Sequence, residues 1–234
     1  MGGNVIKWLG HSCFQIQTSK GKVIFIDPWI TGNPVCPIKL DDVTKVNIVL
    51  VTHDHFDHIA DAAAISKKAG AVVIGFPETV GKLKTGHALP EGHVVFGGIG
   101  MNIGGSTNIE GVSITMTQAF HSSETGMPGG YIIRLEDGKT IYHSGDTGIF
   151  SSMKLLGELY PLDLTMLPIG SCFTMDPFQA AQALKLLQPK RVIPMHYKTF
   201  PILEQDASRF VNQAKKEAPG VEVIVLKPGE EYTL

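Results

Sequence analysis

The sequence predicts an α/β protein built as a sandwich, with β-structure inside and helices on the outside. Two observations predict this class. Strand-like runs are followed by helical segments twice along the chain, once in each half. The runs VNIVLV and AVVIGF are wholly apolar, which is typical of strands buried on both faces. No linker separates the halves, and 234 residues can bury a sizeable core, so we predict a single domain over residues 1–234.

The N-terminal half is predicted to contain three strands and then a strand–helix–strand unit. A Ser-Lys-Gly turn joins the second and third strands. The helix closes on Gly70, a residue suited to a helix C-cap. Glycine-rich residues 90–111 indicate loops and short strands. The predicted elements are strands 4–10, 13–18, 21–29 and 46–51, helix 61–70 and strand 71–76.

The C-terminal half is predicted to repeat the order of strands before helices. A strand is followed by a hairpin that turns at EDGK. Helices and strands then alternate to the end of the chain. The predicted elements are strand 111–120, hairpin 129–145, helix 151–160, strand 162–170, helix 176–188, strand 190–196, helix 202–218 and strand 221–226.

Composition excludes several classes of protein. The net charge of −2 and the absence of a basic stripe argue against a nucleic-acid-binding protein. No apolar run approaches the roughly 20 residues that span a bilayer, so we expect no membrane association. The N-terminus lacks a secretory signal, and three widely spaced cysteines do not suggest a disulfide framework. We therefore expect a cytoplasmic protein.

The segment THDHFDH, residues 52–58, is the strongest chemical signal in the chain. His53 and His55 lie on one side of an extended segment, and Asp57 and His58 can reach the same hollow as the chain turns into the next helix. Neutral imidazole and carboxylate are ligands that zinc prefers. The intervening Asp54 and Phe56 are expected to face away. The segment predicts half of a metal site.

Three further candidates follow predicted strands far along the chain. His121 comes after strand 111–120, Asp146 after the hairpin and His196 after strand 190–196. In layered α/β folds, functional residues gather on loops beyond the strand ends. We therefore expect these three residues to complete a site for two metal ions.

The ordered motifs THDHFDH, AFHSS, HSGDTG and PMHYKTF resemble those of the metallo-β-lactamase superfamily. The resemblance extends over nearly the whole chain, and WLGHSCF, DPWITGNP and PIGSCFTMDP resemble one branch of it. That branch comprises bacterial and archaeal metal-dependent hydrolases related to ascorbate-phosphate lactonase. The resemblance implies a four-layer αβ/βα sandwich with two mixed β-sheets and helices on the outer faces, in agreement with the order of elements above.

The resemblance also implies a role for each candidate residue. One metal ion would be held by His53, His55 and His121, the other by Asp57, His58 and His196, with Asp146 bridging them. Asp27 would support the ligand loop from behind, and Thr174 would line the pocket. His11 would orient a ligand, contact substrate or be a buried structural histidine. Cys172 departs from the branch pattern and is interpreted as a small buried hydrophobe. The catalytic residues implied are Asp146, Asp57 and His196.

The implied function is hydrolysis by a hydroxide held between two metal ions, zinc in the first place, with manganese or iron as alternatives. The bond would be an ester, lactone or phosphodiester in a small metabolite, and the resemblance favours a carboxylic or phosphorylated, hence anionic, substrate. Three alternatives stay open: a nuclease, a di-iron redox enzyme and a non-catalytic metal-binding protein. The sequence also leaves a homo-oligomer open.

Overall fold

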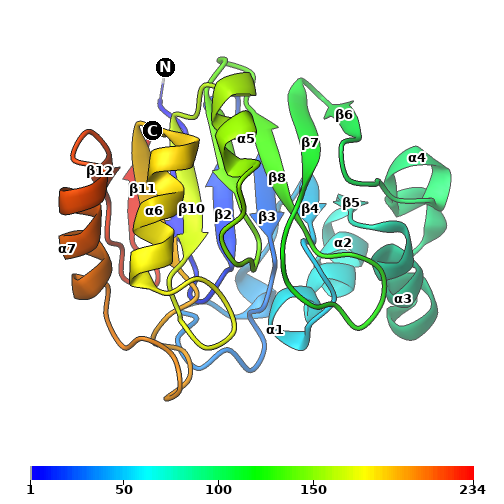
Figure 1. The fold of residues 1–234 in the computed structure, drawn as a ribbon. Coiled ribbons are helices and arrows are strands. Elements are labelled where there is room, and N and C mark those ends of the chain that lie inside the picture. The colour runs from blue at the N-terminus through cyan, green and yellow to red at the C-terminus, as the bar shows by residue number, and fades with distance from the viewer. Residues whose placement is uncertain (1) are drawn as a thin grey trace.

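Two mixed β-sheets form the centre of the molecule in the computed structural model, which describes residues 2–234 (Figure 1). The first sheet has the strand order β13-β1-β2-β3-β4-β5 and the second β12-β11-β10-β9-β8-β7-β6. The strands of the first sheet are β1 (Val5–Trp8), β2 (Phe14–Gln17), β3 (Val23–Ile26), β4 (Ile48–Leu50), β5 (Val72–Ile74) and β13 (Glu231–Thr233). Those of the second are β6 (Ser106–Ile109), β7 (Val112–Gln118), β8 (Gly129–Arg134), β9 (Thr140–His143), β10 (Leu164–Pro168), β11 (Arg191–Met195) and β12 (Glu222–Val223).

Strand β3 shows how the apolar runs build the layers. Its four residues are all buried, and successive side chains point to opposite faces of the sheet. Ile24 and Ile26 belong to the core between the sheets, whereas Val23 and Phe25 belong to a second core under the outer helices. A strand covered on both faces needs this continuous apolar sequence, as predicted.

Helices cover the outer faces of the sandwich, so the predicted layered architecture is confirmed (Figure 1). Helices α5, α6 and α7 pack beside one another over the second sheet, and α2 packs on β4 and β5 of the first. Gly70 ends α2 in the left-handed conformation, as expected for a C-cap. The helices are α1 (Phe56–Ile59), α2 (Ala62–Ala69), α3 (Pro77–His87), α4 (Val95–Gly98), α5 (Met153–Leu159), α6 (Pro177–Leu187) and α7 (Ser208–Glu217), with 3₁₀ turns at Leu40–Asp42 and Glu91–His93.

The structure differs from the predicted elements mainly near the C-terminus. Helix α7 begins at Ser208 rather than at residue 202, because Asp206 accepts a hydrogen bond from the Ser208 amide (2.7 Å) and ends the preceding turn. The last predicted strand is short, since the chain leaves β12 after Val223 and crosses to pair β13 with β1.

Helix α3 was not predicted, because its glycine and β-branched residues weaken the helical pattern.

Strand direction gathers the candidate residues at one edge. Strands β9, β10 and β11 are parallel, and β7 runs the same way because two antiparallel pairings separate it from β9. Their carboxyl ends therefore meet at one edge of the second sheet. Parallel β3 and β4 likewise end together. The loops that follow lie beside α1 at the lower edge of Figure 1.

Among residues 2–234, none of the helices combines the length and the apolar character needed to cross a membrane.

Candidate metal centre

A buried carboxylate, Asp27, organises the start of the histidine cluster. It follows β3 and accepts hydrogen bonds from the Thr52 amide (2.8 Å) and the Thr52 hydroxyl (2.7 Å), and from His58 Nδ1 (2.7 Å). Because the single Thr52 hydroxyl proton goes to Asp27, the same oxygen accepts from His53 Nδ1 at 3.0 Å. We therefore assign a proton to Nδ1 of both His53 and His58, so that Nε2 is the atom of each ring that can bind a metal ion. This is the geometry of an outer partner that orients metal ligands.

Three histidines form the first group of donors. His53 Nε2 lies 2.9 Å from His55 Nδ1, and the rings of His53 and His55 are each 5.1 Å from that of His121. One donor atom from each of the three lies within 4.8 Å of the others. His55 and His121 are 66 residues apart in sequence. They meet because the strands that precede them, β4 and β7, end close together.

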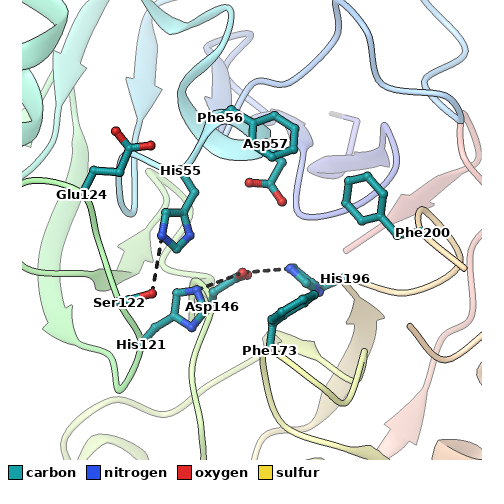
Figure 2. Close-up of a pocket in the computed structure, with 10 residues that line it drawn as sticks. All are labelled: His55, Phe56, Asp57, His121, Ser122, Glu124, Asp146, Phe173, His196 and Phe200. Atoms are coloured by element: carbon teal, nitrogen blue, oxygen red, sulfur yellow. Dashed lines mark hydrogen bonds and ion pairs between the residues drawn. The ribbon is translucent and has the colours of Figure 1, made fainter. Parts of the chain in front are cut away.

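The carboxylate of Asp146 occupies the centre of the cluster (Figure 2). Its Oδ2 lies 2.8 Å from His196 Nε2, 3.3 Å from His58 Nε2 and 3.7 Å from His121 Nε2. Asp146 is almost fully buried. Its carboxylate thus contacts histidines on both sides of the site.

The second group of donors comprises His11, Asp57, His58 and His196. His11 is fully buried; its Nε2 lies 2.9 Å from Asp57 Oδ2 and its Nδ1 3.0 Å from the Thr199 hydroxyl. A carboxylate only accepts, so Nε2 donates to Asp57 and Nδ1 accepts from Thr199. The His11 ring also packs on that of His196, with centroids 3.9 Å apart. His11 therefore lies within the cluster rather than merely beside it.

The backbone at the site adopts conformations that ordinary residues rarely take. His11, Asp27 and His196 have φ values of 54°, 47° and 58°, in the left-handed region. The backbone of His196 can pack against residue 170 because that residue is glycine: a Cβ on Gly170 would lie 2.1 Å from the His196 carbonyl oxygen. Strain of this kind concentrates at functional sites.

The donor set fits divalent metal ions. Nε2 of His58 is buried without a hydrogen-bond partner among the described residues. His58 Nε2 is close to Asp146 yet outside hydrogen-bonding geometry, which is how two ligands of a shared ion face each other. Imidazole nitrogens and carboxylate oxygens suit zinc, manganese or iron.

The surroundings shift the pKa values of the cluster strongly. Burial lowers the pKa of His53 well below its usual value, and burial with the neighbouring His196 lowers that of His11 to about 4. Burial opposes the charged form of His58, but Asp146 and Asp27 outweigh it and raise the pKa of that ring. Burial likewise disfavours the Asp146 carboxylate, yet His196 and His58 hold its pKa far below the usual range. Perturbed groups in a cleft are typical of functional sites.

The residues between the ligand candidates have roles of their own. Asp54 faces away from the cluster, as expected, and anchors the loop after His121 by accepting hydrogen bonds from the amides of Glu124 (2.7 Å) and Thr125 (3.0 Å). Phe56 was expected to face away as well, and that prediction is wrong: it lines the cavity. It stands at the start of α1, where the chain turns and the alternation of an extended segment no longer applies.

A cavity of about 520 Å³ opens over the cluster. Thr174 is not among its lining residues; the adjacent Phe173 takes the predicted place of Thr174. Cys172 was interpreted as buried, but it is exposed and does not line the cavity. The lining residues are His55, Phe56, Asp57, His121, Ser122, Glu124, Asp146, Phe173, His196 and Phe200 (Figure 2).

Comparison with known proteins shows similarity along nearly the whole chain. Residues 22–197 match the family described as "Beta-lactamase superfamily domain". The chain is 50% identical to a "UPF0173 metal-dependent hydrolase" of Nitratidesulfovibrio vulgaris, over 98% of this chain and 95% of that protein. A protein of the same description from Pyrobaculum islandicum is 45% identical, over 96% and 97%. The solved structure of Igni18, a "novel metallo hydrolase" from Ignicoccus hospitalis, matches with a TM-score of 0.88 at 39% identity, over 99% of this chain and 98% of that one.

Proposed function

This chain belongs to the metallo-β-lactamase superfamily, among the UPF0173 metal-dependent hydrolases, and on that premise we propose that it hydrolyses an ester bond of a small molecule with two divalent metal ions at the cluster. The membership confirms the resemblance drawn from the motifs. The ester bond is that of a carboxylic ester, a lactone or a phosphodiester. Zinc is the proposed metal, with manganese or iron as alternatives.

One observation carries the proposal: Asp146 stands between two groups of donors. Its Oδ2 is within 3.7 Å of imidazole nitrogens from both groups. A structural zinc site closes the coordination of a single ion with four ligands. Eight converging donor residues, open to a cavity on one side, instead support a catalytic pair of ions.

Each group of residues has a proposed task. His53, His55 and His121 would hold one ion and Asp57, His58 and His196 the other, with Asp146 shared. When bound, the ions would lower the pKa of a water molecule and polarise the carbonyl or phosphoryl oxygen of the substrate.

Asp57 is suited to orient the attacking water. Burial works against its ionised form, but the hydrogen bond from His11 and the charge of His58 hold its pKa well below the usual range. The carboxylate therefore stays ionised at neutral pH, and it borders the cavity. His11 fixes one of its oxygens, so the carboxylate can accept a hydrogen bond from water in a defined direction.

The proposal is tested by hydrolysis of uncharged esters, lactones and bis-aryl phosphodiesters with metal-loaded protein. We expect turnover of at least one class, and its loss after chelation and in Asp146→Ala. Asp163→Ala, which removes a carboxylate distant from the cavity, is the matched control and should keep turnover. Metal-loaded, folded protein that hydrolyses none of the three classes would contradict the proposal.

A further inference from the structure

The walls of the cavity are aromatic, although its floor is polar. Phe56 and Phe200 lie on one side of the carboxylates and Phe173 on the other (Figure 2). Phe56 is 62% exposed and Phe173 55% exposed. Exposed apolar side chains that converge on a cavity mark a binding surface rather than a core.

The wall formed by Phe56 and Phe200 is held in place from behind. Trp29 is nearly fully buried and stacks on Phe200, with centroids 5.8 Å apart and an interplanar angle of 20°. Phe56 meets the same indole edge-on at 5.5 Å. Both geometries are favourable for aromatic pairs. This wall therefore exists before any substrate arrives.

The opposite wall is held by backbone hydrogen bonds. The Ser171 amide donates to the Met175 carbonyl (3.1 Å), and the Met175 amide donates to the Thr147 carbonyl (3.0 Å). Ser171 and Cys172 take left-handed φ values of 63° and 36° so that the chain can make this turn. The Glu204 amide then donates to the Gly170 carbonyl (3.1 Å), which ties this loop to the segment that follows Phe200. The loop thus presents Phe173 to the cavity without burying it.

The charges at the cavity disfavour an anionic tail on the substrate. Apart from histidine, its ionisable lining residues are Asp57, Glu124 and Asp146, and none of the lining residues among those described is lysine or arginine. Lys82, which contacts the lining residue Glu124, is paired with Glu124 (2.6 Å) and Asp54 (3.3 Å). A carboxylate or phosphate away from the reacting bond would find no cationic side chain in the cavity and would meet Glu124.

We propose that the phenylalanine walls bind an uncharged, apolar group of the substrate, such as an alkyl chain or an aryl ring next to the ester bond. The inference rests on the proposed function, and it replaces the expectation of an anionic group away from the reacting bond with an uncharged one. Burial of one methylene improves binding by up to about fourfold. The preference for longer chains should therefore grow with each added carbon until the cavity is full.

Matched ethyl esters test this in turnover, because their leaving group is small and constant. Ethyl hexanoate should exceed ethyl acetate in kcat/KM by at least about tenfold, and monoethyl adipate, which ends in a carboxylate, should fall well below ethyl hexanoate. In Phe173→Ala and Phe56→Ala the hexanoate-to-acetate ratio should fall several-fold. Phe96→Ala is the control: Phe96 is 53% exposed but belongs to α4, away from the cavity, so the ratio should stay unchanged. If only lactones are turned over, γ-decalactone and γ-butyrolactone replace the esters.

A binding measurement separates this inference from the proposed reaction. The uncharged fluorophore N-phenyl-1-naphthylamine is titrated into metal-loaded and metal-free protein, and we expect binding that Phe173→Ala weakens at least several-fold and Phe96→Ala does not. If Phe173→Ala weakens fluorophore binding and Phe96→Ala does not, but no ester is turned over, the proposed reaction is contradicted and the inference stands. Turnover with equal kcat/KM for hexanoate and adipate, or fluorophore binding indifferent to Phe173→Ala, would overturn the inference and keep the reaction.

Discussion

Replacing Asp27 with asparagine changes one carboxylate oxygen of the site into an amide nitrogen. Oδ1 receives the Thr52 amide, so the asparagine carbonyl would stay there. The new amide would then face the two groups that Oδ2 receives, the Thr52 hydroxyl and His58 Nδ1. An amide N–H donates, so it would reverse both hydrogen bonds.

The reversal would move protons on two histidines. His58 would accept at Nδ1 and carry its proton on Nε2, the atom that faces Asp146. The Thr52 hydroxyl would accept from the amide and donate to His53 Nδ1, so His53 would likewise be protonated on the nitrogen that faces His55. A protonated nitrogen cannot bind a metal ion.

The expected loss of metal affinity follows from these bonds. Restoring the metal-binding form of each ring means giving up one hydrogen bond between neutral groups, about 0.5–1.5 kcal/mol each. Two such bonds amount to about 1–3 kcal/mol, or about 5- to 140-fold in affinity at 1.4 kcal/mol per tenfold. Substitution of a partner behind a metal ligand commonly weakens binding about 10- to 100-fold. We therefore expect a loss of about 10- to 100-fold in metal affinity, the range that both estimates share.

Competition with a chromophoric chelator measures this affinity directly. Thr52→Val removes the hydroxyl that contacts Asp27 and His53 but keeps the hydrogen bond between Asp27 and His58, so it should lose less than Asp27→Asn. Asp163→Asn is the control, because Asp163 is also buried and also accepts a backbone amide, from Thr140, but far from the cluster. Folded Asp27→Asn protein that binds metal as tightly as the wild type would refute the reasoning.

Three further substitutions probe the surroundings of the site. Gly170→Ala should displace the His196 backbone, because its Cβ would overlap the carbonyl oxygen at 2.1 Å; we expect loss of metal at the second group and a lower Tm, and unchanged metal content would disprove the crowding. Asp54→Ala should free the loop that carries Glu124, since it removes the acceptor of two backbone amides; faster hydrogen exchange at residues 123–125 with folded sheets is expected, and wild-type protection there would count against the anchor. Cys172→Ser should keep turnover and metal content while removing the readily modified thiol, because Cys172 is exposed and outside the cavity; a loss of activity would give that thiol a role.

The fold could be predicted from the sequence because its layers have distinct apolar patterns. Continuous runs such as that of β3 specify a strand covered on both faces, and the structure confirms it. Strand β13 could not be predicted in the same way. It is a three-residue edge strand with two exposed residues, and it exists because β1 offers a partner after a long crossing. Such pairing depends on the tertiary structure, and the sequence pattern of the strand itself does not predict it.

The cluster could be predicted in outline because metal chemistry restricts the residue types and strand ends restrict their place. The structure brings together the His53, Asp57 and His196 segments as the motifs suggested. The position of His11 inside the cluster and that of Phe56 on the cavity wall depend on the turns at Gly10 and at the start of α1. An alternation rule that holds for a strand fails at such turns. The aromatic walls could not be predicted either, since Phe56 comes from the start of α1 and Phe173 and Phe200 come from two separate loops.

Anomalous diffraction from crystals of metal-loaded protein, at the absorption edge of the bound element, tests the central claim most directly. We expect two peaks per chain, with Asp146 between them. One peak should lie among His53, His55 and His121, and the other among Asp57, His58 and His196. A single peak, or peaks away from Asp146, would contradict the account.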